Sequence, residues 1–160
     1  PWFDSTLFVI TADHTNEIIS KEYHNTLGHF SVPVAFFMNR SPLRGTKERI
    51  AQQIDIMPSV LGFLNFDQEF IAFGNNLFDN SSDSFAFNTI GSNYYLFMDN
   101  HLLEMIDNRS TRLINYKADR YFENNLVEEL PELRQRMEEK LRAVIQTYNR
   151  RLLDNDLVVK

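Results

Sequence analysis

The sequence contains no cysteine. A disulfide framework, a cysteine-based metal site and a cysteine nucleophile are therefore all excluded within these 160 residues. Because disulfides would have indicated an oxidising compartment, their absence leaves the compartment of the protein open.

Long hydrophobic runs are lacking as well. The longest are residues 7–10 and 32–38, far short of the roughly 20 apolar residues that a membrane-spanning helix needs. Positive charge is sparse, because the formal net charge is −6 and basic residues cluster no further than the pair Arg150 and Arg151. We therefore expect no membrane span in this chain and no nucleic-acid partner, since binding to a phosphate backbone requires clustered Lys or Arg.

What the sequence does contain is enough apolar material for a core, with 43% hydrophobic and 13% aromatic residues. These proportions predict a folded globular chain. The chain starts at Pro1, without an initiator methionine or a signal peptide, and enters an apolar strand almost at once. This start favours a fragment of a longer protein.

The first half of the chain has the pattern of an α/β protein. Residues 6–11 are continuously apolar and β-branched, which predicts a strand that is covered on both faces, as in a parallel sheet. A second apolar run at residues 31–38 carries Pro33 near its start, where a strand tolerates proline. Helical spacing predicts a helix over residues 58–64, with a separate turn before it and Asp55 as a cap or first-turn acid.

The second half changes character at a polar, turn-forming run, residues 79–84. We place a domain boundary there, with one domain at residues 1–79 and another at 80–160. Short strand-like runs separated by turn residues predict an antiparallel meander over residues 85–90, 94–99, 102–106 and 111–116. A helix that begins at Pro131 is expected to cover this sheet with one apolar face, made of Leu133, Met137, Leu141, Val144, Ile145, Tyr148 and Leu152. The predicted fold class is therefore α/β: parallel strands plus a helix, followed by a small antiparallel sheet under a C-terminal amphipathic helix.

The residues with chemical potential are Asp13 and His14, which follow the first strand directly. Ligands of open α/β sheets bind beyond the carboxyl ends of the strands, where this pair falls. A carboxylate beside an imidazole can ligate manganese, magnesium, calcium or zinc. Two ligands do not complete a site, and the alternative interpretation is a surface loop whose charged residues have no catalytic role.

Four segments resemble a known family in sequence and order. Residues 6–15 read TLFVITADHT, and residues 23–25 and 31–37 lead into a strand that opens with proline. Residues 53–61 read QIDIMPSVL, and residues 73–78 read FGNNLF. In this order they resemble the Asp-His turn, the proline-bearing strand, the Asp-(Ile/Leu/Val)-x-Pro-(Thr/Ser) helix start and the Gly-x-x-Leu segment of the alkaline phosphatase superfamily. The likeness is greatest to its sulfatase and lipoteichoic acid synthase (phosphoglycerol transferase) branches, whose C-terminal subdomain the small sheet and helix also resemble.

This resemblance implies that Asp13 and His14 are two ligands of a catalytic divalent metal. It also implies that a further acidic ligand and the nucleophile lie upstream, so that the upstream half of the same polypeptide is a partner of this chain. The implied substrate is a phosphate or sulfate ester, which the nucleophile attacks to form a covalent ester. The fragment alone is expected to be inactive. Its parent is expected to be extracytoplasmic, with membrane helices upstream.

The branch is indicated by the residues around the pair. Thr15 stands where sulfatases often have glycine, and His29 or Phe30 stands where they have an arginine. We therefore favour a phosphoglycerol transferase, with a sulfatase proper as the alternative. Lys21 is the candidate for a sulfate-binding lysine, and His24 is a candidate substrate residue.

A second possible function, from a different class, is a non-catalytic interaction module that uses the small sheet and the terminal helix.

The isolated chain also carries an expectation about self-association. A strand 6–11 without its neighbours would also expose an unpaired edge and apolar faces, which promote self-association. We therefore expect the isolated chain to form a dimer or a swapped assembly.

Overall fold

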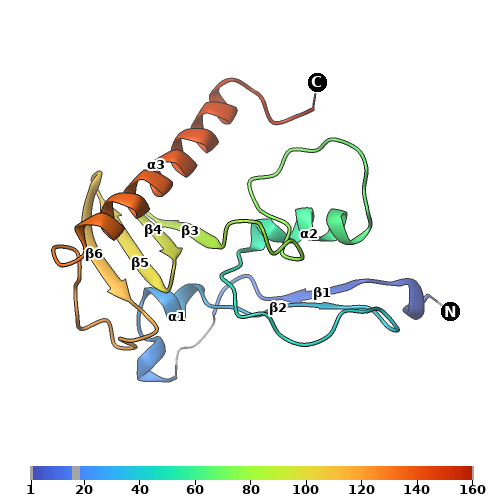
Figure 1. The fold of residues 1–160 in the computed structure, drawn as a ribbon, viewed down its shortest axis with the longest axis horizontal. Coiled ribbons are helices and arrows are strands. Elements are labelled where there is room, and N and C mark those ends of the chain that lie inside the picture. Colours follow the sequence, from blue (N-terminus) through green and yellow to red (C-terminus); the bar gives the residue numbers. More distant parts are fainter. Residues whose placement is uncertain (1, 16–18, 160) are drawn as a thin grey trace. The chain divides into compact units, whose positions relative to one another are not determined.

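The computed structural model describes residues 2–15 and 19–159 (Figure 1). Its secondary structure is mixed α/β, with two antiparallel sheets and a long C-terminal helix. The chain forms two compact units. Unit 1 comprises residues 1–49 together with 120–122, and unit 2 comprises residues 50–119 and 123–160. The domain boundary expected at residues 79–80 stays a prediction.

Unit 1 is built on a two-stranded sheet with short helices around it. The sheet pairs β1 with β2, so that Phe8 lies opposite Phe37 and Thr11 opposite Val34. The elements in chain order are η1 (Phe3–Ser5), β1 (Phe8–Thr11), η2 (Lys21–Tyr23), α1 (Thr26–Phe30) and β2 (Val34–Phe37).

The two strands of unit 1 are antiparallel, so the predicted parallel arrangement is wrong for this pair. A parallel pair needs a long crossover, usually a full α-helix, whereas the helices described between β1 and β2 have three and five residues. The strands are also not covered on both faces, because the Ile10 side chain is 62% exposed. A continuous apolar run indicates a strand but does not fix the direction of its neighbour.

Unit 2 contains a helical turn, a helix and a four-stranded meander under the terminal helix. Its elements are η3 (Gln53–Asp55), α2 (Ile56–Phe63), β3 (Phe85–Ile90), β4 (Asn93–Met98), β5 (His101–Ile106), β6 (Arg109–Asn115) and α3 (Pro131–Leu153). The strands lie in the order β3-β4-β5-β6, and every neighbouring pair is antiparallel. The predicted meander, terminal helix and helix over residues 58–64 with its preceding turn are confirmed.

Two of the hairpin turns show why this segment folds as a meander. Asp99 and Asn100 join β4 to β5, and Asp107 and Asn108 join β5 to β6, all four with positive φ. Positive φ at both central residues is the signature of the type I′ turn, whose twist matches that of the flanking strands. Asp and Asn tolerate this backbone region better than other residues with a Cβ. Local turn chemistry therefore fixes the register of β4, β5 and β6.

The core of unit 2 lies between α3 and the sheet (Figure 1). Met137 and Leu141 of α3 are fully buried against Leu96 of β4, Leu103 of β5 and Leu113 of β6. The predicted apolar face of α3 is thus correct at its centre. It does not extend to the end of the helix, because the side chains of Tyr148 and Leu152 are almost half exposed.

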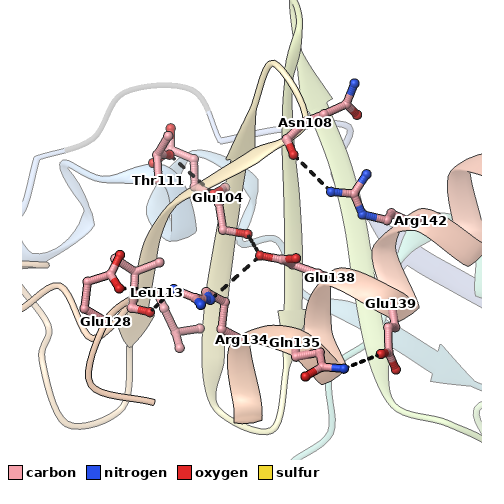
Figure 2. A network of polar contacts seen from close by, with 12 residues as sticks. Glu104, Asn108, Thr111, Leu113, Glu128, Arg134, Gln135, Glu138, Glu139 and Arg142 are labelled. Atoms are coloured by element: carbon pink, nitrogen blue, oxygen red, sulfur yellow. Dashed lines mark hydrogen bonds and ion pairs between the residues drawn. The ribbon is translucent and has the colours of Figure 1, made fainter. Parts of the chain in front are cut away.

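A polar network attaches α3 to strand β6 and its turn (Figure 2). Ser110 Oγ donates to Glu138 Oε1 at 2.6 Å, and Arg134 Nε lies 3.9 Å from the same carboxylate oxygen. One turn further along, Arg142 donates to the backbone oxygen of Asn108 at 3.0 Å. These polar contacts fix α3 along the β6 edge of the sheet, while its apolar face packs against the core.

A second polar cluster, Asp55 with Ser59, joins α2 to residues 75–77. Asp55 Oδ1 accepts from the backbone N–H of Asn75 at 2.7 Å, and Ser59 Oγ accepts from that of Leu77 at 2.8 Å. Gly74 must be glycine here, because a Cβ would lie 2.2 Å from the backbone oxygen of Ile54. The segments 53–61 and 73–78, singled out in the sequence, are therefore two halves of one packed structure.

Membrane-spanning helices are absent from the described ranges: none of their helices has both the length and the apolar character to cross a bilayer.

Candidate metal site at the end of strand β1

Asp13 and His14 lie in a bend that follows β1, as predicted. The backbone N–H of His14 donates to Asp13 Oδ1 at 2.9 Å, which holds the carboxylate against the bend. The other carboxylate oxygen, Oδ2, lies 3.5 Å from His14 Nε2. One oxygen of the carboxylate and one nitrogen of the imidazole are therefore close to each other at the end of the strand.

A second contact fixes the protonation pattern of the imidazole. His14 Nδ1 lies 2.8 Å from the backbone oxygen of Thr15. A carbonyl oxygen only accepts hydrogen bonds, so Nδ1 must carry the proton in this contact. In the neutral ring Nε2 then has a lone pair, and it faces Asp13. Metal-ligating histidines commonly donate their second N–H to a backbone carbonyl in this way.

The pair is open to solvent, with the side chain of His14 63% exposed and that of Asp13 87% exposed. A polar contact so exposed contributes little to stability. Across residues 2–15 and 19–159, no group of three or more His, Cys, Asp or Glu side chains is placed to hold a metal ion. The pair can thus supply two ligands, and the chain as described does not supply a third beside them.

The bend is anchored on helix α1. Thr15 Oγ1 donates to the backbone oxygen of His29 in α1 at 3.0 Å. Asn25 caps this helix by accepting from the backbone N–H of Gly28 at 3.0 Å, and its amide donates to the backbone oxygen of Arg120 at 3.1 Å. Residues 120–122, far along the chain, therefore brace the helix that holds the candidate ligands.

The other two candidate residues lie on a segment of their own. Lys21 begins η2 and His24 follows its end, where the backbone N–H of His24 donates to the backbone oxygen of Lys21 at 3.1 Å. Both side chains are exposed. Their assignment to substrate binding stays a prediction, as does the assignment of Asp13 and His14 to a metal.

Sequence reasoning missed the supporting residues Thr15 and Asn25. Asn25 had a usable signal, since Asn is among the preferred residues just before a helix. Thr15 had none, because its partner is a backbone oxygen 14 residues further along the chain.

Comparisons with known proteins find a similarity in structure but none in sequence. No protein-family model matches the sequence, and no curated protein matches it. Among solved structures, a protein in the alkaline phosphatase superfamily from Vibrio parahaemolyticus has a similar fold, with a TM-score of 0.73 and 19% sequence identity. The match covers 99% of this chain and 38% of that protein.

At this level of identity the likeness is one of fold. This chain has the fold of part of an alkaline phosphatase superfamily protein, over little more than a third of that protein's length. The predicted fold class, a partial α/β core followed by a small antiparallel sheet under a C-terminal helix, is confirmed, apart from the direction of β1 relative to β2.

Proposed function

We propose that this chain is the C-terminal part of a metal-dependent enzyme of the alkaline phosphatase superfamily, of the phosphoglycerol transferase type, with a sulfatase proper as the alternative. The reaction is the transfer of phosphoglycerol, or the hydrolysis of a phosphoric or sulfuric ester. The observation that carries the proposal is the Asp13–His14 geometry, in which Oδ2 and Nε2 lie 3.5 Å apart at a strand end. The shared fold with a superfamily protein, whose relatives are enzymes, supports it.

The donor atoms fit the group that this function requires. The carboxylate oxygen suits all four proposed cations, manganese, magnesium, calcium and zinc. The imidazole nitrogen suits zinc best among them, because magnesium and calcium prefer oxygen ligands. When bound, the cation supplies Lewis-acid stabilisation of an ester oxygen and activation of a nucleophile. Asp13 contributes negative charge, and His14 contributes Nε2, held in place by the contact of Nδ1 with the Thr15 carbonyl.

The missing parts belong to the upstream half of the same polypeptide in this proposal. That half contributes at least one further acidic ligand and the Thr, Ser or modified Cys nucleophile. The chain alone is then inactive, and its parent is an extracytoplasmic enzyme with upstream membrane helices. Thr15, His29 and Phe30 differ from the sulfatase pattern at the corresponding positions, which favours phosphoglycerol or phosphate esters over sulfate esters.

The test is turnover by the complete protein with three substrates: a phosphatidylglycerol donor, an aryl phosphate and an aryl sulfate. We expect phosphoester turnover to exceed sulfate turnover, and Asp13→Asn to abolish it. Asp107→Asn is the matched control, because it changes an exposed carboxylate in a turn of unit 2. Full turnover by the Asp13 variant, or no turnover of any of the three esters by the unaltered protein, would contradict the proposal. The second result would favour an interaction module.

A further inference from the structure

Thr15 makes two contacts, one through its backbone oxygen and one through its side-chain hydroxyl. Its backbone oxygen accepts from His14 Nδ1 at 2.8 Å, while its hydroxyl donates to the backbone oxygen of His29 at 3.0 Å. The hydroxyl therefore fixes the residue whose carbonyl orients the imidazole. Through its carbonyl and its hydroxyl, Thr15 therefore links the imidazole of His14 to helix α1.

Without a fixed acceptor, a neutral imidazole populates two tautomers, which differ in the ring nitrogen that carries the proton. Only the tautomer protonated at Nδ1 leaves a lone pair on Nε2. Nε2 is the nitrogen that lies 3.5 Å from Asp13 Oδ2. The tautomer of His14 therefore decides whether the two side chains can act on one cation.

We infer that Thr15 is a positioning residue for His14: its side chain, anchored on α1, holds the backbone carbonyl that selects the Nδ1-protonated tautomer and aims Nε2 at the carboxylate of Asp13. The effect on a cation rests on the proposed function. The effect on the tautomer does not, because it follows from the contacts of this chain alone.

The anchor is itself well supported. Helix α1 has a capping bond at its start, from the backbone N–H of Gly28 to Asn25 Oδ1, and a bond from the Asn25 amide to the backbone oxygen of Arg120. Gly28 is buried so tightly that a Cβ would lie 2.0 Å from the backbone oxygen of Tyr23. A rigid helix end gives the Thr15 hydroxyl a fixed acceptor.

The experiment compares Thr15→Val, which removes the hydroxyl and keeps the shape, with Thr15→Ser, which restores the hydroxyl. Thr46→Val is the matched control, since Thr46 is an exposed threonine of unit 1. The first readout is the pair of ring ¹⁵N chemical shifts of His14 in the metal-free complete protein, in buffer alkaline enough to keep imidazole neutral. His14→Gln identifies the signal. Circular dichroism confirms that each variant is folded.

We expect the Nδ1-protonated tautomer alone in the unaltered protein, in Thr15→Ser and in Thr46→Val, and a mixture in Thr15→Val. The second readout is manganese affinity, which should fall about 10- to 100-fold in Thr15→Val only. An unchanged tautomer in Thr15→Val, or protonation at Nε2 in the unaltered protein, would overturn the inference. A tautomer shift in a protein that binds no manganese, magnesium, calcium or zinc would support the positioning role and contradict the proposed function.

Discussion

The carboxylate of Asp55 accepts a hydrogen bond from the backbone N–H of Asn75 at 2.7 Å, across 20 residues of sequence. Its other oxygen accepts from the backbone N–H of Gln52 at 2.9 Å, and the side chain is only 3% exposed. One buried carboxylate thus caps the turn before α2 and holds the segment that begins at Gly74. These contacts join residues 53–61 to residues 73–78 in this chain.

The first prediction concerns this carboxylate. Asp55→Ala should lower the free energy of unfolding by about 3 kcal/mol, because two backbone N–H groups lose a charged acceptor. Asp67→Ala, at an exposed position, should change it by less than about 0.5 kcal/mol. Urea denaturation of the chain measures both values. Equal effects of the two substitutions would show that the Asp55 contacts do not stabilise the fold.

The antiparallel sheet of unit 2 could be predicted from the sequence because its signals are local. Alternating apolar residues and Asp-Asn turns specify β4, β5 and β6 without reference to distant residues. The apolar face of α3 was equally accessible, since helical spacing alone places Met137 and Leu141 on one side.

The features that escaped prediction depend on contacts between distant residues. The direction of β2 relative to β1 is decided by the path of the connecting residues, which apolar content does not encode. The anchoring of Thr15 on His29 and of Asn25 on Arg120 joins residues 14 and 95 positions apart. The pair Asp13 and His14 was found because both residues are adjacent in sequence, whereas its supports are adjacent only in space.

The second prediction tests the core between α3 and the sheet. Leu141→Ala should lower the free energy of unfolding by about 2–5 kcal/mol, since it removes a fully buried side chain and leaves a cavity. Leu153→Ala on the same helix should have an effect below about 0.5 kcal/mol, because that side chain is 85% exposed. Thermal unfolding monitored by circular dichroism distinguishes the two. A small effect of Leu141→Ala would contradict the described packing.

The third prediction concerns pH. Lys140 holds the pKa of Asp83 below its ordinary value, through a hydrogen bond first and through its charge second, while burial opposes the shift. A lowered folded-state pKa stabilises the fold above the unfolded pKa of about 3.9, and this stabilisation disappears as the pH falls through the folded-state value. Because the Asp83 side chain is 71% exposed, we expect Lys140→Met to cost less than about 1 kcal/mol at neutral pH.

The difference in unfolding free energy between Lys140→Met and the unaltered chain should shrink as the pH falls below about 4, because Asp83 becomes protonated first in the unfolded chain and, at lower pH, in the folded chain. A residual, pH-independent part would report the position of Lys140 Nζ 4.4 Å from the centre of the Phe85 ring. Urea denaturation at several pH values measures the difference. A difference that stays constant down to about pH 2 would contradict the assigned ion pair.

The fourth prediction concerns self-association of the isolated 160-residue chain. Within the described part of unit 1, β1 and β2 each pair with one strand only, and Ile10 and Phe37 are 62% and 45% exposed. We expect dimers by light scattering at about 100 μM, through strand edges and apolar faces. Ile10→Lys should shift the chain toward monomer, and Leu153→Lys, at an exposed apolar residue of α3, should not. A monomeric unaltered chain would contradict the expectation.

The most direct test of the central claim is calorimetric titration of the complete protein with manganese, magnesium, calcium and zinc. At least one cation should bind with a stoichiometry of one or more per chain. Asp13→Ala and His14→Ala should each weaken that binding by more than about 100-fold, and Asp107→Asn should leave it unchanged. Binding that is equally strong in all four proteins would contradict the assignment of Asp13 and His14 as metal ligands.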